Sequence, residues 1–236
     1  MQTIYLRKKH SRLVLLLLLV LCIVIVFVRI MLPPPVAPTM VEPFRQGAGG
    51  EQLVSLAINV DWGEEYLPDI LAVLAEHNVQ VSFFLTGRWA NNNSELAAQI
   101  AAAGHEIGNH GYSHASPNNS SYDEIKAEIF KTEQAIERAT GIKTTLYAPP
   151  SGESDAHVLQ AAADSGYITI LWSVDTIDWQ RPSAATIIER VTGKIHDGAI
   201  ILAHPTAPTL EALPTILRDL QTEGYRFVPV SENIGL

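Results

Sequence analysis

The residues best suited to chemistry are two histidines, His110 and His114, in the stretch His-Gly-Tyr-Ser-His. Neutral imidazole is the commonest metal-ligating side chain, and two imidazoles close together can share one ion. If this segment forms a helical turn, the spacing of four positions puts both rings on one face. The alternative is a surface turn that merely carries two histidines, because two ligands do not complete a metal site.

Polar side chains at several other positions directly follow short apolar runs, each of which predicts a buried strand. These side chains are Asp61, Asp175, Asp178 and His204, and His110 is placed in the same way. The carboxyl ends of parallel strands meet at one rim of an α/β sheet, where such folds keep their binding sites. The spacing therefore predicts that these side chains converge on one site.

Short apolar runs alternate with amphipathic helical patterns from residue 53 to the end of the chain. The predicted strands are 53–60, 79–85, 106–108, 144–147, 168–174, 199–202 and 226–229. The predicted helices are 65–77, 94–103, 122–140, 156–164, 184–195 and 210–222, and Ser121 and Glu124 form a capping box before the third. This alternation predicts an α/β fold with a parallel sheet. About seven units are too few for a complete eight-unit barrel, so an incomplete, distorted barrel and a doubly wound sheet both fit.

The chain begins with a basic stretch and an apolar run. The run is long enough to span a bilayer if Arg29 extends to the interface, which predicts one transmembrane helix. A cleaved signal peptide is the alternative, but there is no small-x-small cleavage site before the prolines that follow, which favours a retained anchor. The predicted segments are a basic tail (1–12), an anchor (13–32), a proline- and glycine-rich linker (33–50) and one domain (51–236).

Charge is distributed unevenly along the 236 residues, whose formal net charge is −9. Basic residues precede the predicted span, so the N-terminus is expected in the cytoplasm and the domain outside the cell membrane. From residue 51 onward there are ten Lys and Arg against 24 Asp and Glu. So acidic a domain is a poor partner for nucleic acid or for an anionic lipid surface, and is compatible with a neutral or amino-sugar polymer.

Five ordered motifs between residues 53 and 236 resemble those of the polysaccharide deacetylase (NodB homology) family. They are Asn59-Val-Asp61-Trp62-Gly63, His110-Gly-Tyr-Ser-His114, Tyr147-Ala148-Pro149-Pro150-Ser151-Gly152, Asp175-Thr-Ile-Asp178-Trp179 and Leu202-Ala-His204. The resemblance implies a NodB-like distorted, incomplete (β/α) barrel. It also implies a hydrolase that removes N-acetyl groups from a cell-wall or spore-wall glycan such as peptidoglycan. The anchor and the variant first motif resemble a sporulation-associated branch of the family.

The resemblance also implies roles for individual residues. His110 and His114 would hold a divalent metal, with zinc favoured, which polarises the acetamide carbonyl and activates a water. Asp61 would act as general base, His204 as general acid, and Asp178 would orient His204. The substrate groove would be formed by Trp179, Pro149, Pro150 and Trp62.

Three departures from the family pattern concern the site directly. Trp62 stands where the family has its metal-ligating aspartate, and an indole cannot coordinate a hard cation. Ala148 replaces the arginine that holds the base, and Ser151 replaces a tyrosine. Glu64 or Glu65 could supply a third metal ligand, and Asn109 could contribute an oxygen. The sequence therefore favours an active deacetylase and leaves two alternatives open: a catalytically inactive glycan-binding or scaffold relative, and a hydrolase of a different amide.

Overall fold

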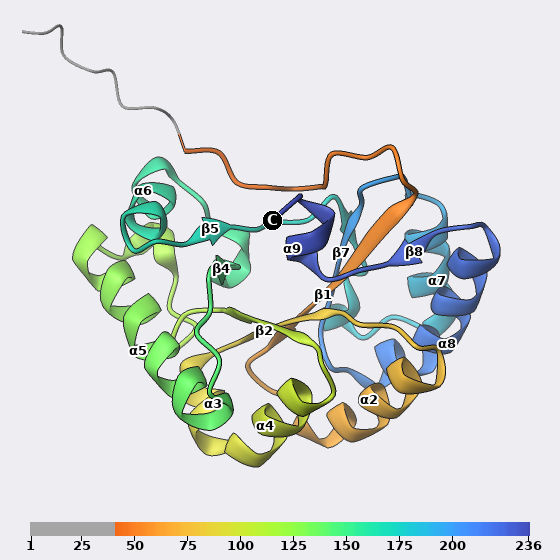
Figure 1. Ribbon diagram of the computed structural model, residues 1–236, viewed down its shortest axis with the longest axis horizontal. Helices are drawn as coiled ribbons and strands as arrows, with labels where there is room; N and C mark the ends of the chain where they lie inside the picture. Colours follow the sequence, from red (N-terminus) through yellow and green to blue (C-terminus); the bar gives the residue numbers. More distant parts are fainter. Residues whose placement is uncertain (1–40) are drawn as a thin grey trace, which may run out of the picture. The chain divides into compact units, whose positions relative to one another are not determined.

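A curled sheet of short parallel strands forms the centre of the molecule (Figure 1). The computed structural model describes residues 41–236. The predicted basic tail and membrane anchor, and the first part of the predicted linker, lie outside the described residues. The strands are β1 (Leu53–Val60), β2 (Ser82–Leu85), β3 (Glu106–Asn109), β4 (Leu146–Tyr147), β5 (Ile168–Thr169), β6 (Val174–Asp175), β7 (Ile200–Ala203) and β8 (Arg226–Phe227). Their order is β5-β4-β3-β2-β1-β7-β6, with β8 paired to the start of β1.

Most helices lie around the outside of the curl (Figure 1), whereas Val230 of the short helix α9 packs in the apolar cluster on its inner side. The α-helices are α2 (Leu67–Glu76), α3 (Gly87–Asn92), α4 (Ser94–Ala102), α5 (Tyr122–Thr140), α6 (Ala156–Asp164), α7 (Ala184–Thr192), α8 (Ala207–Thr222) and α9 (Val230–Asn233). Single 3₁₀ turns are η1 (Glu64–Tyr66), η2 (Pro117–Asn119), η3 (Pro150–Gly152) and η4 (Asp178–Gln180). The fold is thus the predicted incomplete barrel, and not a doubly wound sheet, because most helices cover the outer side of a sheet that curls on itself.

The central strand β1 separates two apolar clusters by the alternation of its side chains. Val54, Leu56, Ile58 and Val60 face outward into the large cluster beneath the helices. Ala57 faces the inside of the curl, where it belongs to a smaller cluster with Phe84, Ala148 and Ile170. By the same alternation, Asn59 faces inward near the carboxyl end of the strand. β1 thus places a polar side chain inside the curl.

Several predicted elements match the structure. Strand 53–60 and helices 122–140 and 156–164 have the predicted bounds. The capping box is also confirmed: Ser121 Oγ accepts the Glu124 backbone N–H, and the Glu124 carboxylate accepts the Ser121 N–H at 2.7 Å. Such a cap stabilises a helix start by about 1 kcal/mol.

The predicted strand 168–174 is wrong. It is two strands, β5 and β6, at opposite edges of the sheet: β5 pairs with β4 and β6 pairs with β7. Because the barrel does not close, the chain crosses the open side between the two edges, and its apolar side chains are buried along that crossing. This path and a single buried strand both give a continuous apolar run in the sequence, so the sequence pattern does not tell them apart.

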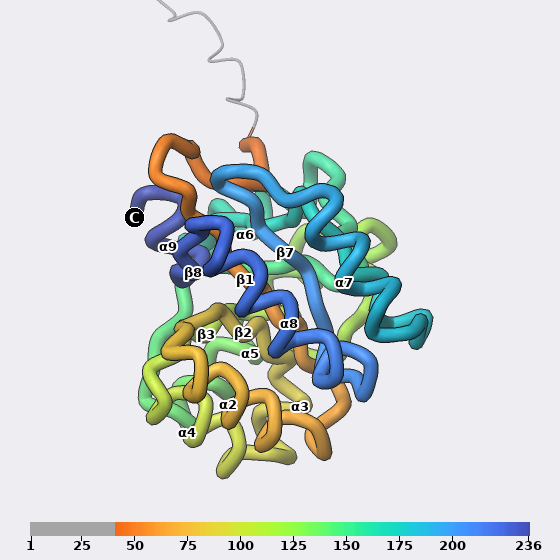
Figure 2. Tube along the Cα trace, turned by 90° about the vertical axis from the view of Figure 1, so that its right-hand side faces the viewer, coloured from red at the N-terminus to blue at the C-terminus, as the bar shows by residue number. Residues whose placement is uncertain are grey.

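Residues 44–47, which the sequence assigns to the linker, make backbone hydrogen bonds to the domain. Phe44 N donates to Thr169 O at 2.9 Å, and Phe44 O accepts from Leu171 N at 2.7 Å. Gly47 N donates to Gly198 O at 2.7 Å, just before β7. The segment therefore joins the two sides of the open curl, and it lies at the same end of the domain as the C-terminus (Figure 2). Among residues 41–236, no helix is long and apolar enough to cross a membrane.

Candidate active site

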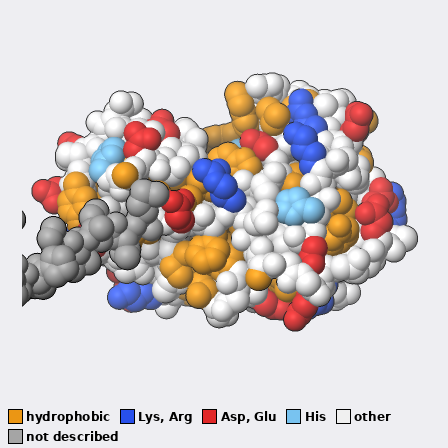
Figure 3. Space-filling model, turned by 90° about the horizontal axis from the view of Figure 1, so that it is seen from above, with side chains coloured by type: hydrophobic (Ala, Val, Ile, Leu, Met, Phe, Trp, Pro, Cys, Tyr) orange, Lys and Arg blue, Asp and Glu red, His pale blue; other side chains and the backbone are white. Residues whose placement is uncertain are grey.

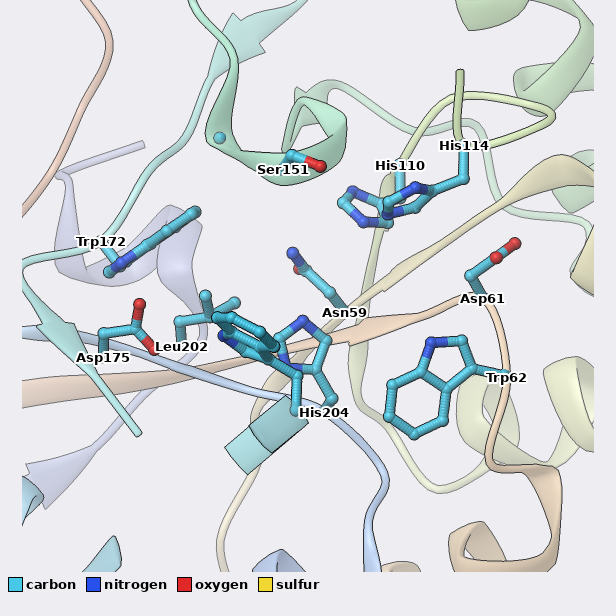
Figure 4. A pocket seen from close by; sticks show the side chains of 12 residues that line it. Asn59, Asp61, Trp62, His110, His114, Ser151, Trp172, Asp175, Leu202 and His204 are labelled. Atoms are coloured by element: carbon cyan, nitrogen blue, oxygen red, sulfur yellow. The ribbon is translucent and has the colours of Figure 1, made fainter. Parts of the chain in front are cut away.

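A cavity of about 480 Å³ opens at the carboxyl ends of the strands. This volume lies within the range of about 300–1,000 Å³ that is usual for small-molecule sites. Its lining residues come from every motif of the sequence (Figure 4): Asn59, Asp61, Trp62, His110, His114, Ser151, Gly152, Trp172, Asp175, Trp179, Leu202 and His204. The predicted convergence of polar side chains at one rim is therefore present in the fold.

His110 and His114 lie together, with ring centroids 5.0 Å apart and an edge-to-face arrangement. They do not share a helical turn. The chain bends back after β3 through left-handed backbone at Gly111 (φ 72°) and His114 (φ 58°), which brings the second ring beside the first. Left-handed backbone is uncommon for a residue with a Cβ, and such positions cluster at functional sites.

The environment of His110 fixes its tautomer. Its Nδ1 lies 2.6 Å from the carbonyl oxygen of Ala148, so Nδ1 carries the proton and Nε2 is left with a free lone pair. Burial, and then the neighbouring His114, lower the pKa of His110 to about 3, although the bond to Ala148 opposes the shift. His110 is therefore neutral at physiological pH, in the form that binds metals or accepts a hydrogen bond.

Glu128 of α5 holds the loop that carries His114. Its Oε2 accepts hydrogen bonds from Tyr112 N at 3.0 Å and from Ser113 N at 2.8 Å. The Ser113 hydroxyl donates to the same oxygen at 2.9 Å. Three donors on one carboxylate oxygen stabilise the bend of the loop. Helix α5 therefore helps to position the His114 imidazole, although His114 lies outside this helix.

His204, which follows β7, and Asp178, which follows β6, form a hydrogen-bonded pair. His204 Nδ1 lies 2.7 Å from Asp178 Oδ1, and the backbone N–H of His204 donates to Oδ2 at 2.6 Å. Thr209 at the start of α8 also donates to Oδ2, at 2.6 Å. Burial alone would raise the pKa of Asp178, but the bonds from His204 and Thr209 outweigh it, and the pKa lies below its ordinary value. Asp178 is thus an ionised, buried group that orients the His204 ring.

Asp61 is held by residues that the motifs did not indicate. Thr86 Oγ1 donates to its Oδ1 at 2.8 Å, and Arg88 Nη2 lies 3.0 Å from both carboxylate oxygens. Arg88 belongs to α3, a helix that the sequence did not predict, so its position could not be foreseen. It supplies the cation next to Asp61 that is missing at Ala148.

Trp62 occupies the position of the expected metal-ligating carboxylate. Its indole is stacked toward His204, with ring planes 8° apart and centroids 6.1 Å apart. A catalytic zinc site takes three protein ligands, and residues 41–236 contain no group of three His, Cys, Asp or Glu side chains arranged to hold an ion. The donor set present, two imidazoles, does not fit a complete catalytic metal site.

The other candidate ligands lie elsewhere. Glu64 and Glu65 are exposed in η1 and do not line the cavity. The amide of Asn109 is already occupied: Nδ2 donates to Ile129 O at 2.8 Å, and Oδ1 accepts from Gly111 N at 2.9 Å. No carboxylate of η1 therefore stands beside the two histidines.

The predicted groove is formed in part by other residues. Trp179 stands at the rim with 55% of its surface exposed, and Trp62 is also partly exposed. Pro149 and Pro150 are buried and do not line the cavity. Trp172, which the sequence placed inside a strand, lines the cavity from the crossing between β5 and β6. Three tryptophans thus line the cavity.

Backbone strain is also found at the rim. Ser151 in η3 has φ 58°, and Ile177 next to Asp178 has φ 52°. For a β-branched residue this conformation is a clear outlier, at a cost of about 1–3 kcal/mol. Ile177 N donates to Asp175 Oδ1 at 2.8 Å, so Asp175 caps the turn that presents Asp178 and Trp179.

Figure 3 shows the charges on one face of the domain, seen from above the view of Figure 1. On the face shown in Figure 3, the few Lys and Arg side chains are separated from one another by acidic, apolar and uncharged side chains. The shown face therefore lacks the continuous basic patch that a phosphate backbone requires.

The fold and the five motifs define a family, and comparison with known proteins identifies it. The profile of the polysaccharide deacetylase family matches residues 46–170. The chain is also 37% identical over 188 residues to a peptidoglycan-N-acetylglucosamine deacetylase of Bacillus cereus, covering 77% of this chain and 68% of that protein. The protein belongs to the polysaccharide deacetylase family, which is the carbohydrate esterase family 4 (CE4).

Further similarities are to a curated protein and to solved structures. The chain is 42% identical to the uncharacterized protein YlxY of Bacillus subtilis over 191 residues, which are 81% of this chain and 60% of YlxY. Among solved structures, a CE4 family pseudoenzyme from Bacillus anthracis superimposes with a TM-score of 0.79 at 44% identity, covering 81% of this chain and 68% of that one. A mutant of that pseudoenzyme is described as having restored enzymatic activity, and is 43% identical with the same TM-score.

Proposed function

We propose that this domain binds an N-acetylated cell-wall glycan without removing acetyl groups at an appreciable rate. It would act as a glycan-binding member of a family whose other members are peptidoglycan deacetylases. This proposal chooses the inactive alternative of the sequence analysis over the active hydrolase.

The observation that carries the proposal is the position of Trp62. An indole stands in the place of the third metal ligand, and neither Glu64 nor Glu65 lines the cavity. Loss of the carboxylate removes a donor atom and a negative charge from a site that would otherwise neutralise a divalent ion. The similarity to a CE4 pseudoenzyme supports the same choice.

The lining of the cavity supports a carbohydrate as ligand. Ligand sites are mostly apolar and aromatic, with a few polar groups that fix orientation. Here Trp62, Trp172 and Trp179 provide flat apolar faces, while His110 and His204 provide polar atoms. Relatives named as peptidoglycan-N-acetylglucosamine deacetylases support an N-acetylglucosamine-containing glycan such as peptidoglycan. A spore-wall glycan belongs to the same chemical class.

The decisive experiment measures binding and hydrolysis on one preparation. Residues 41–236, which form one compact unit, would be titrated with the β-1,4-linked pentamer of N-acetylglucosamine and pulled down with insoluble peptidoglycan. Acetate release would be measured with added zinc. We expect binding with acetate release near background. Zinc-dependent release at the rate of the Bacillus cereus relative, measured in parallel, would overturn the proposal.

A matched pair of aromatic substitutions tests whether the cavity is the binding site. Trp179→Ala should weaken binding to the pentamer by about tenfold or more, since it removes an exposed aromatic face from the rim. Phe130→Ala serves as the control, because Phe130 is similarly exposed (57%, against 55% for Trp179) but lies on α5, away from the cavity. Equal losses in the two variants would mean that binding is not at the cavity.

A second candidate function is slow, metal-dependent deacetylation. It is favoured by one observation: His110 presents a free Nε2, and the His204–Asp178 pair is complete. Zinc would then be held by His110 and His114 alone among protein side chains. Acetate release that disappears on chelation and returns with zinc would support this candidate against the first.

We also propose a location for the domain, outside the cell membrane and anchored by residues 13–32. The apolar run and the basic residues before it support this orientation. A peptidoglycan ligand is found on that side. Membrane fractionation of the full chain and of a chain lacking residues 1–32, with protease added to intact cells, tests the proposal. A protease-resistant domain in intact cells would contradict it.

A further inference from the structure

Asn59 is a buried amide that the fold leaves without a complete set of hydrogen bonds. It is 5% exposed, and its Oδ1 has no hydrogen-bond partner within residues 41–236. Buried polar groups in folded proteins are nearly always paired, so each exception requires a reason. By contrast, the neighbouring Asn109 uses both ends of its amide in bonds to the backbone.

The position of Asn59 distinguishes it from the other unpaired groups. Four buried side-chain atoms in the described part of the chain lack a partner: Asn59 Oδ1, Trp89 Nε1, Thr169 Oγ1 and Asn233 Oδ1. Of these four residues, Asn59 is the one that lines the cavity. Figure 4 shows it between the histidine pair and His204. An unpaired amide at the floor of a ligand cavity is available to a ligand.

The strand holds the backbone of Asn59 in place. Asn59 pairs with Phe84 of β2, and the preceding Ile58 pairs with Ala203 of β7, so β1 is fixed on both sides at this level. Asn59 and Asp61 are two positions apart and project to the same side of the chain. The backbone that carries the amide therefore does not need to be ordered when a ligand arrives, which lowers the entropic cost of binding.

The chemistry of the floor indicates what the amide would bind. A primary amide both donates and accepts, and its oxygen and nitrogen can exchange places by rotation. Its natural complement is another amide, which offers one N–H and one C=O. The tryptophans that line the same cavity suit a sugar ring.

We propose that Asn59 recognises the acetamido group of the bound glycan and so gives the cavity its preference for N-acetylated sugars. This inference rests on the proposed glycan-binding function and adds the group that is recognised. Asn59 would act as a specificity-determining residue, independent of any metal.

The test compares two neutral β-1,4-linked pentamers, one of N-acetylglucosamine and one of glucose. They differ in bearing an acetamido group or a hydroxyl at the second carbon, and neither carries a charge that the acidic domain would attract. We expect residues 41–236 to bind the N-acetylglucosamine pentamer at least about tenfold more tightly, equivalent to ~1.4 kcal/mol. Asn59→Leu, of similar size and without polar atoms, should remove most of this preference.

A second measurement separates specificity from stability. Because Asn59→Leu removes an unpaired buried group, its Tm should equal or exceed that of the wild type. Thr169→Val is the matched control, since it also removes an unpaired buried group but outside the cavity, and it should leave the preference unchanged. If Asn59→Leu does not fold, Asn59→Ser provides the same comparison with a smaller polar side chain.

The outcomes for Asn59 and for the proposed function are distinct. Equal binding of the two pentamers by the wild type, or an unchanged preference in Asn59→Leu, would overturn the role of Asn59 and leave glycan binding intact. Binding of neither pentamer, nor of insoluble peptidoglycan, would overturn both. Loss of the preference for the N-acetylglucosamine pentamer in both Asn59→Leu and Thr169→Val would show a general effect on packing. That result would also overturn the role of Asn59.

Discussion

Arg88 Nη2 lies 3.0 Å from both carboxylate oxygens of Asp61, although the two residues come from different βα units. The cation expected at Ala148 is thus replaced by one from α3. Ala148 itself is 5% exposed and packs in the apolar cluster with Phe84 and Ile170. The cation next to Asp61 therefore comes from α3, and position 148 is part of the apolar core.

This exchange predicts that Ala148→Arg is strongly destabilising. The new side chain would place a charge without a partner in a packed apolar cluster, and we expect a loss of more than about 3 kcal/mol of unfolding free energy. Urea unfolding of residues 41–236 measures it. Arg88→Gln is the comparison: its ion pair is half exposed and contributes only ~0.2–1 kcal/mol. Similar midpoints for Ala148→Arg and the wild type would contradict the packing of this cluster.

A second prediction concerns His105, a buried histidine outside the cavity. Its Nδ1 accepts the Val81 N–H at 3.3 Å, and burial lowers the pKa of His105 from 6.5 to about 4. In the unfolded chain the imidazole takes up a proton near pH 6.5, whereas in the folded protein it does so only near pH 4. Stability should therefore fall as the pH decreases through this window.

The magnitude and the test for His105 follow from the same shift. A shift of this size corresponds to at most ~3.4 kcal/mol of unfolding free energy, most of which should be lost between pH 7 and pH 4. Urea unfolding at pH 7, 6, 5 and 4 measures it. His105→Gln should be less stable at pH 7, because it loses the packing against Phe83, but should show a flatter dependence on pH. Identical slopes in the two proteins would refute the assignment.

Much of the fold was predictable because its signals are local. Strand 53–60 is a long apolar run, and helix 122–140 has both amphipathic periodicity and a capping box, so their bounds were correct. The single predicted strand 168–174 was wrong because the apolar run records burial and not the path of the chain. Two-residue strands such as β5 and β6 are too short to give a periodicity.

Some residues of the site were also predictable from the sequence, and others were not. The position of His204 follows from topology, since parallel strands deliver their carboxyl ends to one rim. Arg88 and Trp172 were missed because one lies in an unpredicted short helix and the other in the apolar crossing. Asn59 was visible only as part of a motif, because whether a buried amide is paired depends on tertiary neighbours.

A third prediction concerns the segment before β1. Residues 44–47 make backbone hydrogen bonds to both sides of the open curl. A chain that starts at Glu51 should therefore be less stable than one that starts at Val41, by about 1 kcal/mol, or ~2–4 °C in Tm. Phe44→Ala in the longer chain separates the contribution of the side chain from that of the backbone. Equal Tm values for the two chains would mean that the segment contributes nothing to stability.

The last prediction is that Trp62→Asp moves the domain toward an enzyme. The substitution adds a carboxylate to His110 and His114 and completes a three-ligand donor set. Zinc affinity, measured by calorimetry, should rise at least about tenfold, and His110→Ala should abolish the gain. Acetate release from the N-acetylglucosamine pentamer should rise as well, as the restored activity of a mutant CE4 pseudoenzyme suggests. Because Arg88 already holds Asp61, no arginine at position 148 is needed.

Adding Asp61→Asn to the Trp62→Asp protein should reduce the gained activity by about 10²-fold or more while leaving the protein folded, which tests Asp61 as the base. A folded, zinc-binding Trp62→Asp protein that releases no acetate would show that a missing metal-ligating carboxylate is not the reason for the low activity proposed here.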